Sequence, residues 1–321
     1  MGDIKRIYNQ NRKAIWIIII IIFFLILILK AVNYFIGKNS LNNIKGNEKN
    51  ENSYNIVSNT IIQSDKSTIS GQSIPKDSLQ IATGIIEKFF DYCNKEKYED
   101  AYNLLTDDCK NEIYPSLQDF ENFYCKNMFN GIEKNVSAEN WIDNIYKVKI
   151  SQNYLSSGEY NNQNEMQDYV TIDKNNKNEY KLNINGYLGK NKINKECEKE
   201  KINIKVVEEN RYMNYTIYTY EITNNSYKEI IMDPLTNVDS MYIQDKNNIK
   251  YVPYTHELSD SQMIIAQGEK RQLKIKYYSK YISNKVINKI VFSKVVLDYD
   301  RYSSFTNKSY YNDYNNFEIN I

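Results

Sequence analysis

A long apolar run near the start of the chain is its clearest pattern. Residues 14–29 are sixteen uninterrupted apolar residues, AIWIIIIIIFFLILIL, and the apolar character resumes after Lys30 and continues to Ile36. About 20 such residues in a helix span the roughly 30 Å hydrocarbon core of a bilayer. Summed over the run, insertion is favourable by roughly 5–10 kcal/mol. The pattern predicts a transmembrane helix over residues 14–36, with the lipid bilayer as its partner.

A cleaved signal peptide is the competing interpretation of this run. The apolar region of a signal peptide is about 7–15 residues long and is followed by a small-x-small cleavage site. This run is longer, and the residues KAVNY that follow it contain no such site. We therefore expect an uncleaved anchor.

Lysine and arginine flank the predicted span and suggest its orientation. The four basic residues before it are Lys5, Arg6, Arg12 and Lys13. Lys30, Lys38 and Lys45 follow, and Lys30 lies at the interface. Because basic residues favour the cytoplasmic side, we expect residues 1–13 to be cytoplasmic and the C-terminal portion to be extracytoplasmic. Residues 37–76 are polar, rich in Asn and Ser, and without a sustained period, which predicts a flexible linker.

Helical periodicity begins after this linker. Asp77 or Ser78 is placed to cap a helix in which apolar residues recur at helical spacing from Ile81 to Tyr92. A short second helix is expected over residues 98–105. A third follows Pro115 over residues 116–129, with Ser116 as its cap.

Strand patterns follow these helices. Strands are expected over residues 141–155, 166–172 and 180–188, with a polar turn at residues 173–178. Three helices followed by strands favour a compact α+β domain over residues 77–190, with three helices packed on a curved antiparallel sheet.

The order of these elements resembles a known superfamily. A helix, the segment NKEKYEDAYNLLTDDCK, a further helix and strands ending in YKLNINGYL resemble the nuclear-transport-factor-like superfamily of cone-shaped α+β domains. This superfamily includes isomerases and hydratases. It also includes non-catalytic modules, such as membrane-anchored subunits of conjugation and type IV secretion machines and an N-terminal domain of some penicillin-binding proteins.

From Lys201 onward the pattern is entirely β. The expected strands cover residues 202–206, 216–222, 241–244, 248–252, 271–278 and 289–297. About seven short strands in some 100 residues favour a β-sandwich over residues 200–300. The segments YEITNNSYKEI, MYIQDKNNIKYV and IIAQGEKRQLKIKY are similar to an immunoglobulin-like module of Gram-positive surface proteins. Residues 301–321 form a Tyr- and Asn-rich tail, for which one edge strand and disorder are both open.

Composition excludes some classes of function. With 41 Lys+Arg against 40 Asp+Glu, the chain lacks the basic excess of a nucleic-acid binder driven by whole-chain charge. The abundance of Ile, Asn, Lys and Tyr matches codons rich in A and T, as in clostridia and related Gram-positive bacteria. The 30 tyrosines are therefore explained by genomic bias and core packing, although Tyr also suits a ligand-stacking surface.

The chemistry-bearing residues form no recognisable site. His256 is the only histidine, so we expect an exposed loop residue rather than a metal ligand. Cys93, Cys109, Cys125 and Cys197 form no CxxC pair, which argues against zinc. Buried thiols are favoured for Cys93 and Cys125, and one disulfide among the first three cysteines stays open.

Several acidic residues are candidates for a site in a cavity, but no pair of them stands out in the sequence. The candidates for a perturbed carboxylate opposed by a tyrosine are Asp91, Asp143, Asp168 and Glu179. The segment from Asp173 to Glu179 faintly resembles a calcium loop but lacks its glycine, so a hairpin turn explains it better. The chain contains no Walker A, GxGxxG, HExxH or GxSxG motif. We assign no catalytic, cofactor-binding or metal-binding residue and expect no cofactor.

Together these patterns predict a non-catalytic, single-pass protein of the cell envelope. Its expected role is that of an extracytoplasmic binding or scaffold protein with a protein or cell-wall glycan partner and no nucleic acid. One alternative is a component of a conjugation or type IV secretion machine. Another is a cavity enzyme of the isomerase or hydratase type, which requires a pocket of about 300 Å³ or more holding a buried carboxylate.

Overall fold

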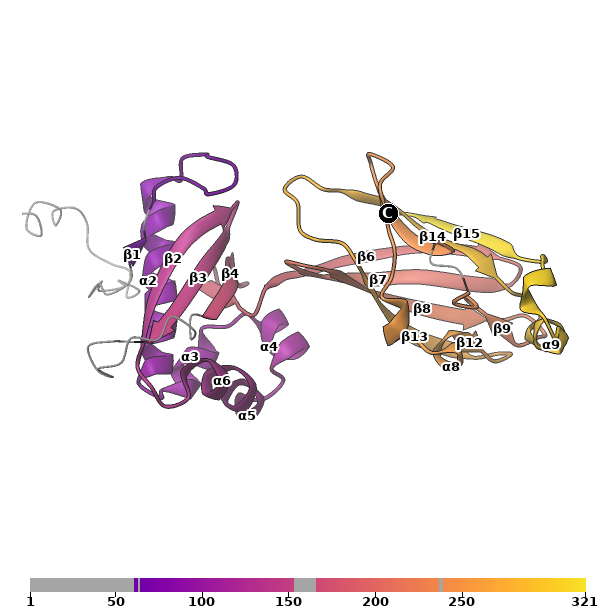
Figure 1. Cartoon of the computed structure of the whole chain (residues 1–321), viewed down its shortest axis with the longest axis horizontal. Coiled ribbons are helices and arrows are strands. Elements are labelled where there is room, and N and C mark those ends of the chain that lie inside the picture. Colours follow the sequence, from indigo (N-terminus) through magenta and orange to yellow (C-terminus); the bar gives the residue numbers. More distant parts are fainter. Residues whose placement is uncertain (1–60, 63, 153–165, 237–238) are drawn as a thin grey trace, which may run out of the picture. The chain divides into compact units, whose positions relative to one another are not determined.

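Two hydrophobic cores organise the part of the chain that the computed structural model describes (Figure 1). The described residues are 61–62, 64–152, 166–236 and 239–321. They form an α+β structure with mostly antiparallel sheets, as the sequence predicts in outline. The first core lies between helices and a five-stranded sheet, and the second lies between two four-stranded sheets.

The first core is covered by the helices that the periodicity predicts and by one that it misses. Their bounds are α2 Lys76–Asn94, α3 Tyr98–Asn103, α4 Asp107–Ile113, α5 Leu117–Phe120, the π-helical turn η1 Glu121–Cys125 and α6 Lys126–Phe129. The apolar stripe of α2 is buried, including Ile85 and Phe89. The missed helix is α4, which begins after Thr106, whose hydroxyl accepts a hydrogen bond from the Cys109 N–H (3.0 Å).

A π-helical turn interrupts the helix predicted over residues 116–129. Ser116 caps its start as expected, because its hydroxyl accepts from the Asp119 N–H (3.1 Å). The turn η1 then inserts an extra residue into the helical register. Tyr124 and Cys125 are consequently both buried, while Phe123 is left exposed.

The sheet of the first core has the order β1-β2-β3-β4-β5. Its strands are β1 Ile61–Ile62, β2 Lys134–Ile142, β3 Ile145–Gln152, β4 Met166–Lys174 and β5 Tyr180–Asn183. Only β1 runs parallel to its neighbour.

Two predicted strands in this region are divided by turns. The strand expected over residues 141–155 is interrupted at Asp143, where φ is 51°, and Trp141 belongs to β2. The strand expected over residues 180–188 is broken by Asn185 and Gly186, whose φ angles are 57° and 67°. Asn and Gly both tolerate this left-handed conformation, so this dipeptide ends β5 and starts the next strand in a new direction.

The last part of the predicted linker is attached to the sheet. Ile61 lies opposite Ser137 on β2. The buried Ser67 donates its hydroxyl hydrogen to the Trp141 carbonyl (2.9 Å), and the Thr68 N–H donates to the Asn140 carbonyl (2.9 Å). The C-terminal part of residues 37–76 therefore belongs to the folded structure. The attachment involves too few residues to leave a periodic pattern in a polar sequence.

The second core is formed by strands from both four-stranded sheets. One sheet has the order β13-β8-β7-β6 and the other has the order β11-β10-β14-β15. Their bounds are β6 Tyr187–Lys199, β7 Ile202–Tyr212, β8 Thr216–Asn224, β10 Met241–Asp245, β11 Lys250–Tyr251, β13 Lys270–Tyr277, β14 Ile287–Val295 and β15 Asn315–Asn320. The rings of Tyr220 on β8 and Phe292 on β14 meet edge to face at 5.3 Å between centroids, so the sheets share one core.

Strand β6 is missing from the sequence prediction. Most of its residues are Lys, Glu or Asn, and most of them are exposed. It lies at the end of its sheet. Charged side chains on an outer strand discourage pairing with another chain, but they also remove the apolar alternation by which a strand is recognised.

Shorter elements complete the second core. They are β9 Ile230–Ile231 paired with β12 Ile264–Ile265, the 3-10 helices η3 Thr255–Glu257 and η4 Lys308–Tyr310, and the helices α8 Asp260–Met263 and α9 Tyr299–Ser304. In the predicted tail, β15 pairs with β14 and buries Phe317 and Ile319. Of the two alternatives for the tail, the edge strand is the one observed.

The predictions for residues 1–13 and 14–36, and for most of the linker, lie outside the described residues. Among the helices within residues 61–62, 64–152, 166–236 and 239–321, none combines the length and apolarity needed to cross a membrane.

Candidate functional site

Of the four acidic candidates, the structure buries Asp168 alone. Asp91, Asp143 and Glu179 are exposed. Asp91 forms a surface ion pair with Lys95 (2.8 Å), and Glu179 accepts from the Asn175 side chain (2.8 Å) in the expected hairpin turn. The four carboxylates are not brought together.

Asp168 points into the first core because of its position on β4. It lies opposite Val148 on β3, and both residues are on the face that packs against the helices. The Tyr124 hydroxyl donates to its Oδ2 (2.8 Å), as does the Asn185 N–H (3.0 Å). The Gly186 N–H donates to Oδ1 (3.1 Å) and also reaches the Tyr169 carbonyl (3.0 Å). The carboxylate thus ties β4 to the π-helical turn and to the turn before β6.

Burial is the largest influence on the pKa of the Asp168 carboxyl group. It raises the pKa of Asp168 above the usual value, although the N–H and hydroxyl donors around the carboxylate act in the opposite direction. The pKa of Tyr124 is raised well above its usual value, first by burial and then by the neighbouring Asp168. Tyr124 therefore stays protonated and acts as a hydrogen-bond donor.

The raised pKa of Asp168 gives a pH-dependent contribution to stability. The folded protein holds the Asp168 proton more tightly than the unfolded chain, whose aspartate pKa is about 3.9. The contribution of Asp168 is therefore fully present below that value and is lost as pH rises through the folded-state pKa. In urea unfolding at a series of pH values, the wild type should lose stability relative to Asp168→Asn as pH rises from about 4. A wild-type advantage that grows with pH would show that the hydrogen-bond donors outweigh burial.

Aromatic rings fill the space around Asp168 and Tyr124. Phe120 stacks on Tyr124 at 5.6 Å between centroids, Tyr114 meets Tyr124 edge to face at 6.0 Å, and Phe89 lies at 5.9 Å. The protein's own aromatic rings therefore fill the space beside the carboxylate. The arrangement stabilises three segments of the fold, and a reactant would have to displace rings to reach it.

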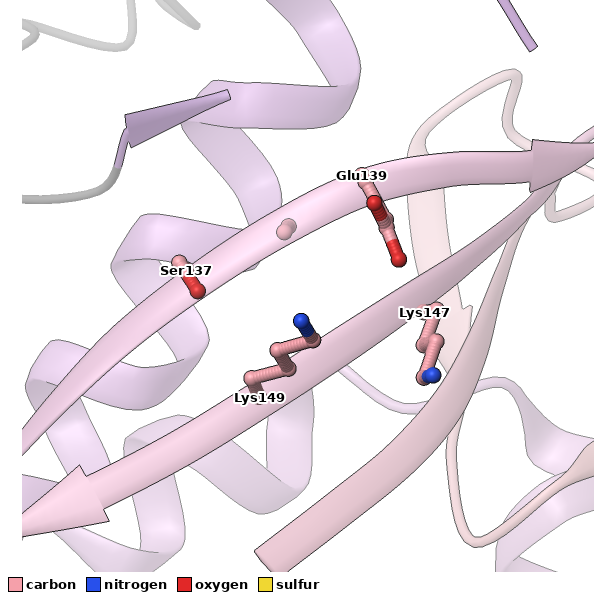
Figure 2. Close-up of a pocket in the computed structure, with 5 residues that line it drawn as sticks. Ser137, Glu139, Lys147 and Lys149 are labelled. Carbon is pink, nitrogen blue, oxygen red and sulfur yellow. The ribbon is translucent and has the colours of Figure 1, made fainter. Parts of the chain in front are cut away.

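A shallow depression lies elsewhere, on strands β2 and β3. It has a volume of about 170 Å³, and Figure 2 shows the side chains along it. It is lined by Ser137, Ala138, Glu139, Lys147 and Lys149. Because this space includes open solvent, the depression encloses far less than the roughly 300–1,000 Å³ that is typical of small-molecule sites.

His256 and the cysteines occupy the predicted environments. His256 lies in η3 with an exposed side chain, 3.9 Å from Glu257. Cys93 and Cys125 are buried free thiols whose sulfur atoms are 3.9 Å apart. Burial is the main cause that raises the pKa of Cys93, and it raises that of Cys109 to about 12. Within the described residues, no group of His, Cys, Asp or Glu side chains is arranged to hold a metal ion.

The sequence interpretation missed a cluster of aromatic and charged side chains beside β13. This tyrosine–lysine cluster consists of Tyr215, Tyr254, Glu257, Lys276 and Tyr278. Tyr254 and Tyr278 stack face to face at 3.5 Å between centroids. The Lys276 ammonium lies 4.4 Å from the Tyr215 ring centre and 4.3 Å from that of Tyr254, and it pairs with Glu257 (2.8 Å).

Backbone hydrogen bonds position the tyrosine–lysine cluster. The Tyr254 N–H donates to the Lys276 carbonyl (2.8 Å), and the Tyr278 N–H donates to the Val252 carbonyl (2.9 Å). The segment after β11 therefore runs along the end of β13. Tyr278 is 49% exposed, so part of the stack is accessible. Alternation on β13 places Lys276 and Tyr278 on one face, but the sequence gives no signal that pairs them with residues 215 and 254.

Comparisons with known proteins add no relative. No protein-family model matches the chain, and no match is found among curated proteins or among solved structures.

Proposed function

We propose that the protein is a membrane-anchored, extracytoplasmic binding or scaffold protein of the cell envelope. The apolar run at residues 14–36 supports the anchor. Beyond it, the linker leads to two folded regions that carry the contacts with a partner.

The proposed domain families follow the resemblances in the sequence. For residues 77–190 we propose a nuclear-transport-factor-like domain, supported by the order of helices before an antiparallel sheet. For residues 200–300 we propose an immunoglobulin-like module, supported by two four-stranded sheets that share a core. The outer strands of these sheets, β6 and β15, lie outside residues 200–300, so the sandwich runs from residue 187 to residue 320.

The observation that carries the proposed role is the partly exposed tyrosine–lysine cluster, in which Tyr278 and Glu257 are the exposed members. Tyrosine offers an apolar ring and a polar hydroxyl, a combination common at protein interfaces. In this cluster the Tyr278 ring is held by its stack on Tyr254. Because this ring is already held in place, a binding partner restricts its motion little further. The entropic cost of association is therefore reduced. We propose that a protein or a cell-wall glycan contacts this cluster.

Photo-crosslinking in intact cells tests this role. With p-benzoylphenylalanine at position 278, we expect a crosslinked product that mass spectrometry can identify. The matched control is position 227, because Tyr227 is 77% exposed and lies in the turn after β8, outside the cluster. Position 278 should give at least severalfold more product than position 227.

Equal labelling from both positions, or none from position 278, would contradict a partner at the cluster. Protease added to the same intact cells controls for topology, since it should remove the C-terminal portion. If the crosslinked partners are components of a conjugation or secretion machine, and deletion of the protein abolishes transfer, that alternative replaces a general scaffold role.

A further inference from the structure

A second exposed surface lies on the two loops at one end of the sheet that contains β10 and β14. We call it the loop-tip surface and define it by Lys246, Ile249, Lys280, Ile282 and Val286. The first two residues lie between β10 and β11, and the other three lie between β13 and β14. The Lys246 N–H donates to the Val286 carbonyl (3.1 Å), so the two loops are neighbours.

Three aliphatic side chains of the loop-tip surface are exposed to water. Ile249 is 52% exposed, Ile282 is 57% exposed and Val286 is 45% exposed. The Lys285 N–H donates to the Ile282 carbonyl (3.1 Å), so a tight turn brings Ile282 and Val286 together. Grouped exposed aliphatic residues of this kind indicate an interaction site.

The chain segment that includes the second of these loops carries charges of one sign only. Residues 270–297 contain eight Lys or Arg and no Asp or Glu, in a chain whose net charge is +1. Several of these lysines are paired with acids from other strands, such as Lys270 with Glu221 (2.9 Å) and Lys289 with Glu318 (2.9 Å).

The lysines of the loop-tip surface are not neutralised in this way. Lys246 and Lys280 are exposed and form no ion pair with the described part of the chain. Asp245, the nearest acid in sequence, is turned inward and accepts from the Tyr251 hydroxyl (3.0 Å).

One exposed acid borders the surface: Asp143 accepts from the Tyr281 hydroxyl (2.6 Å) and the Ser283 hydroxyl (3.3 Å). Exposed aliphatic side chains therefore lie beside two lysines and one carboxylate, and neither Lys246 nor Lys280 is paired with that carboxylate.

We propose that the loop-tip surface docks onto a bilayer that contains anionic lipids. Aliphatic side chains enter the boundary between headgroups and acyl chains, while the neighbouring lysines contact anionic headgroups. A soluble polyanion satisfies the lysines but leaves the aliphatic residues in water, which favours the bilayer. The inference rests on the proposed membrane anchor, because the span attaches the chain to a bilayer. Docking gives the chain a second membrane attachment.

Hydrogen exchange of the full chain tests the docking. The protein is reconstituted through its own span into nanodiscs of phosphatidylcholine alone or of phosphatidylcholine with phosphatidylglycerol. In the anionic discs, the amides of residues 246–250 and 279–286 should exchange on the order of tenfold more slowly. High salt should reverse this protection.

Two variants separate charge from apolar contact. Lys246→Glu with Lys280→Glu, and Ile249→Ser with Ile282→Ser, should each remove the protection without unfolding the protein, because all four residues are exposed. Lys174→Glu with Lys177→Glu is the charge-matched control and should retain the protection, since both lysines are exposed, Lys174 at the end of β4 and Lys177 in the turn that follows it.

The remaining outcomes decide against docking. Equal exchange in neutral and anionic discs overturns the proposal. Protection by soluble poly(glycerol phosphate) as strong as that in anionic discs assigns the surface to an anionic polymer and also overturns it. If the membrane anchor itself is absent, the protein will fail to co-purify with either disc, which distinguishes that failure from a failure of docking.

Discussion

Replacing Asp168 with alanine should lower the free energy of unfolding by about 3–5 kcal/mol. The substitution leaves the Tyr124 hydroxyl and the Asn185 N–H without their acceptor in the first core. Each buried donor without a partner costs about 1–3 kcal/mol. Urea unfolding of the full chain in detergent, followed by circular dichroism, measures the loss. Hydrogen exchange should show that it is greatest in β4 and η1.

Matched variants test the stated cause. Tyr124→Phe removes one donor and retains the ring, so it should cost about 1–2 kcal/mol. Asp173→Ala, at an exposed position on the same strand, should change stability by less than about 0.5 kcal/mol. If Asp168→Ala costs no more than Asp173→Ala, the buried carboxylate does not hold these segments together.

Replacing Phe292 with alanine should destabilise the second core by about 3–5 kcal/mol. Phe292 on β14 is fully buried and meets Tyr220 of the opposite sheet edge to face. The substitution loses this contact and leaves a cavity that β-strands in two packed sheets cannot readily close. Thermal or urea unfolding, with hydrogen exchange of β8 and β14 as the local probe, measures the effect.

Phe123→Ala is the control for the loss of a phenyl ring. Phe123 is exposed on the π-helical turn, so its removal should change stability by less than about 0.5 kcal/mol. Equal effects of the two substitutions would mean that Phe292 does not join the two sheets.

Sequence patterns predicted well those elements whose own consecutive residues show a clear apolar spacing or a clear β propensity. Helix α2 was predicted because its apolar residues repeat at helical spacing, and β8 because β-branched and aromatic residues follow one another. Strand β6 was missed because its charged residues hide the alternation. Helix α4 was missed because it is only seven residues long and buries a single residue, Cys109.

For the candidate site, the sequence predicted the types of residue involved but not which of them is buried or what it contacts. Asp168 was one of four acidic candidates, and nothing near it in the sequence distinguishes it from Asp143. Its burial depends on the register of β4 against β3, and its partners come from positions 124, 185 and 186. Such contacts between distant positions follow from the assembled fold.

By itself, the sequence determined the apolar run, the order of helices and then strands, and the lack of common catalytic motifs, because each is encoded by residues close together in the chain. Only the tertiary structure decided that Asp168 is buried and that Tyr254 stacks on Tyr278. It also decided that the loops carrying Lys246 and Ile282 lie side by side. The physical reason is that burial and side-chain contact depend on strand register and sheet packing, which bring together residues far apart in the chain.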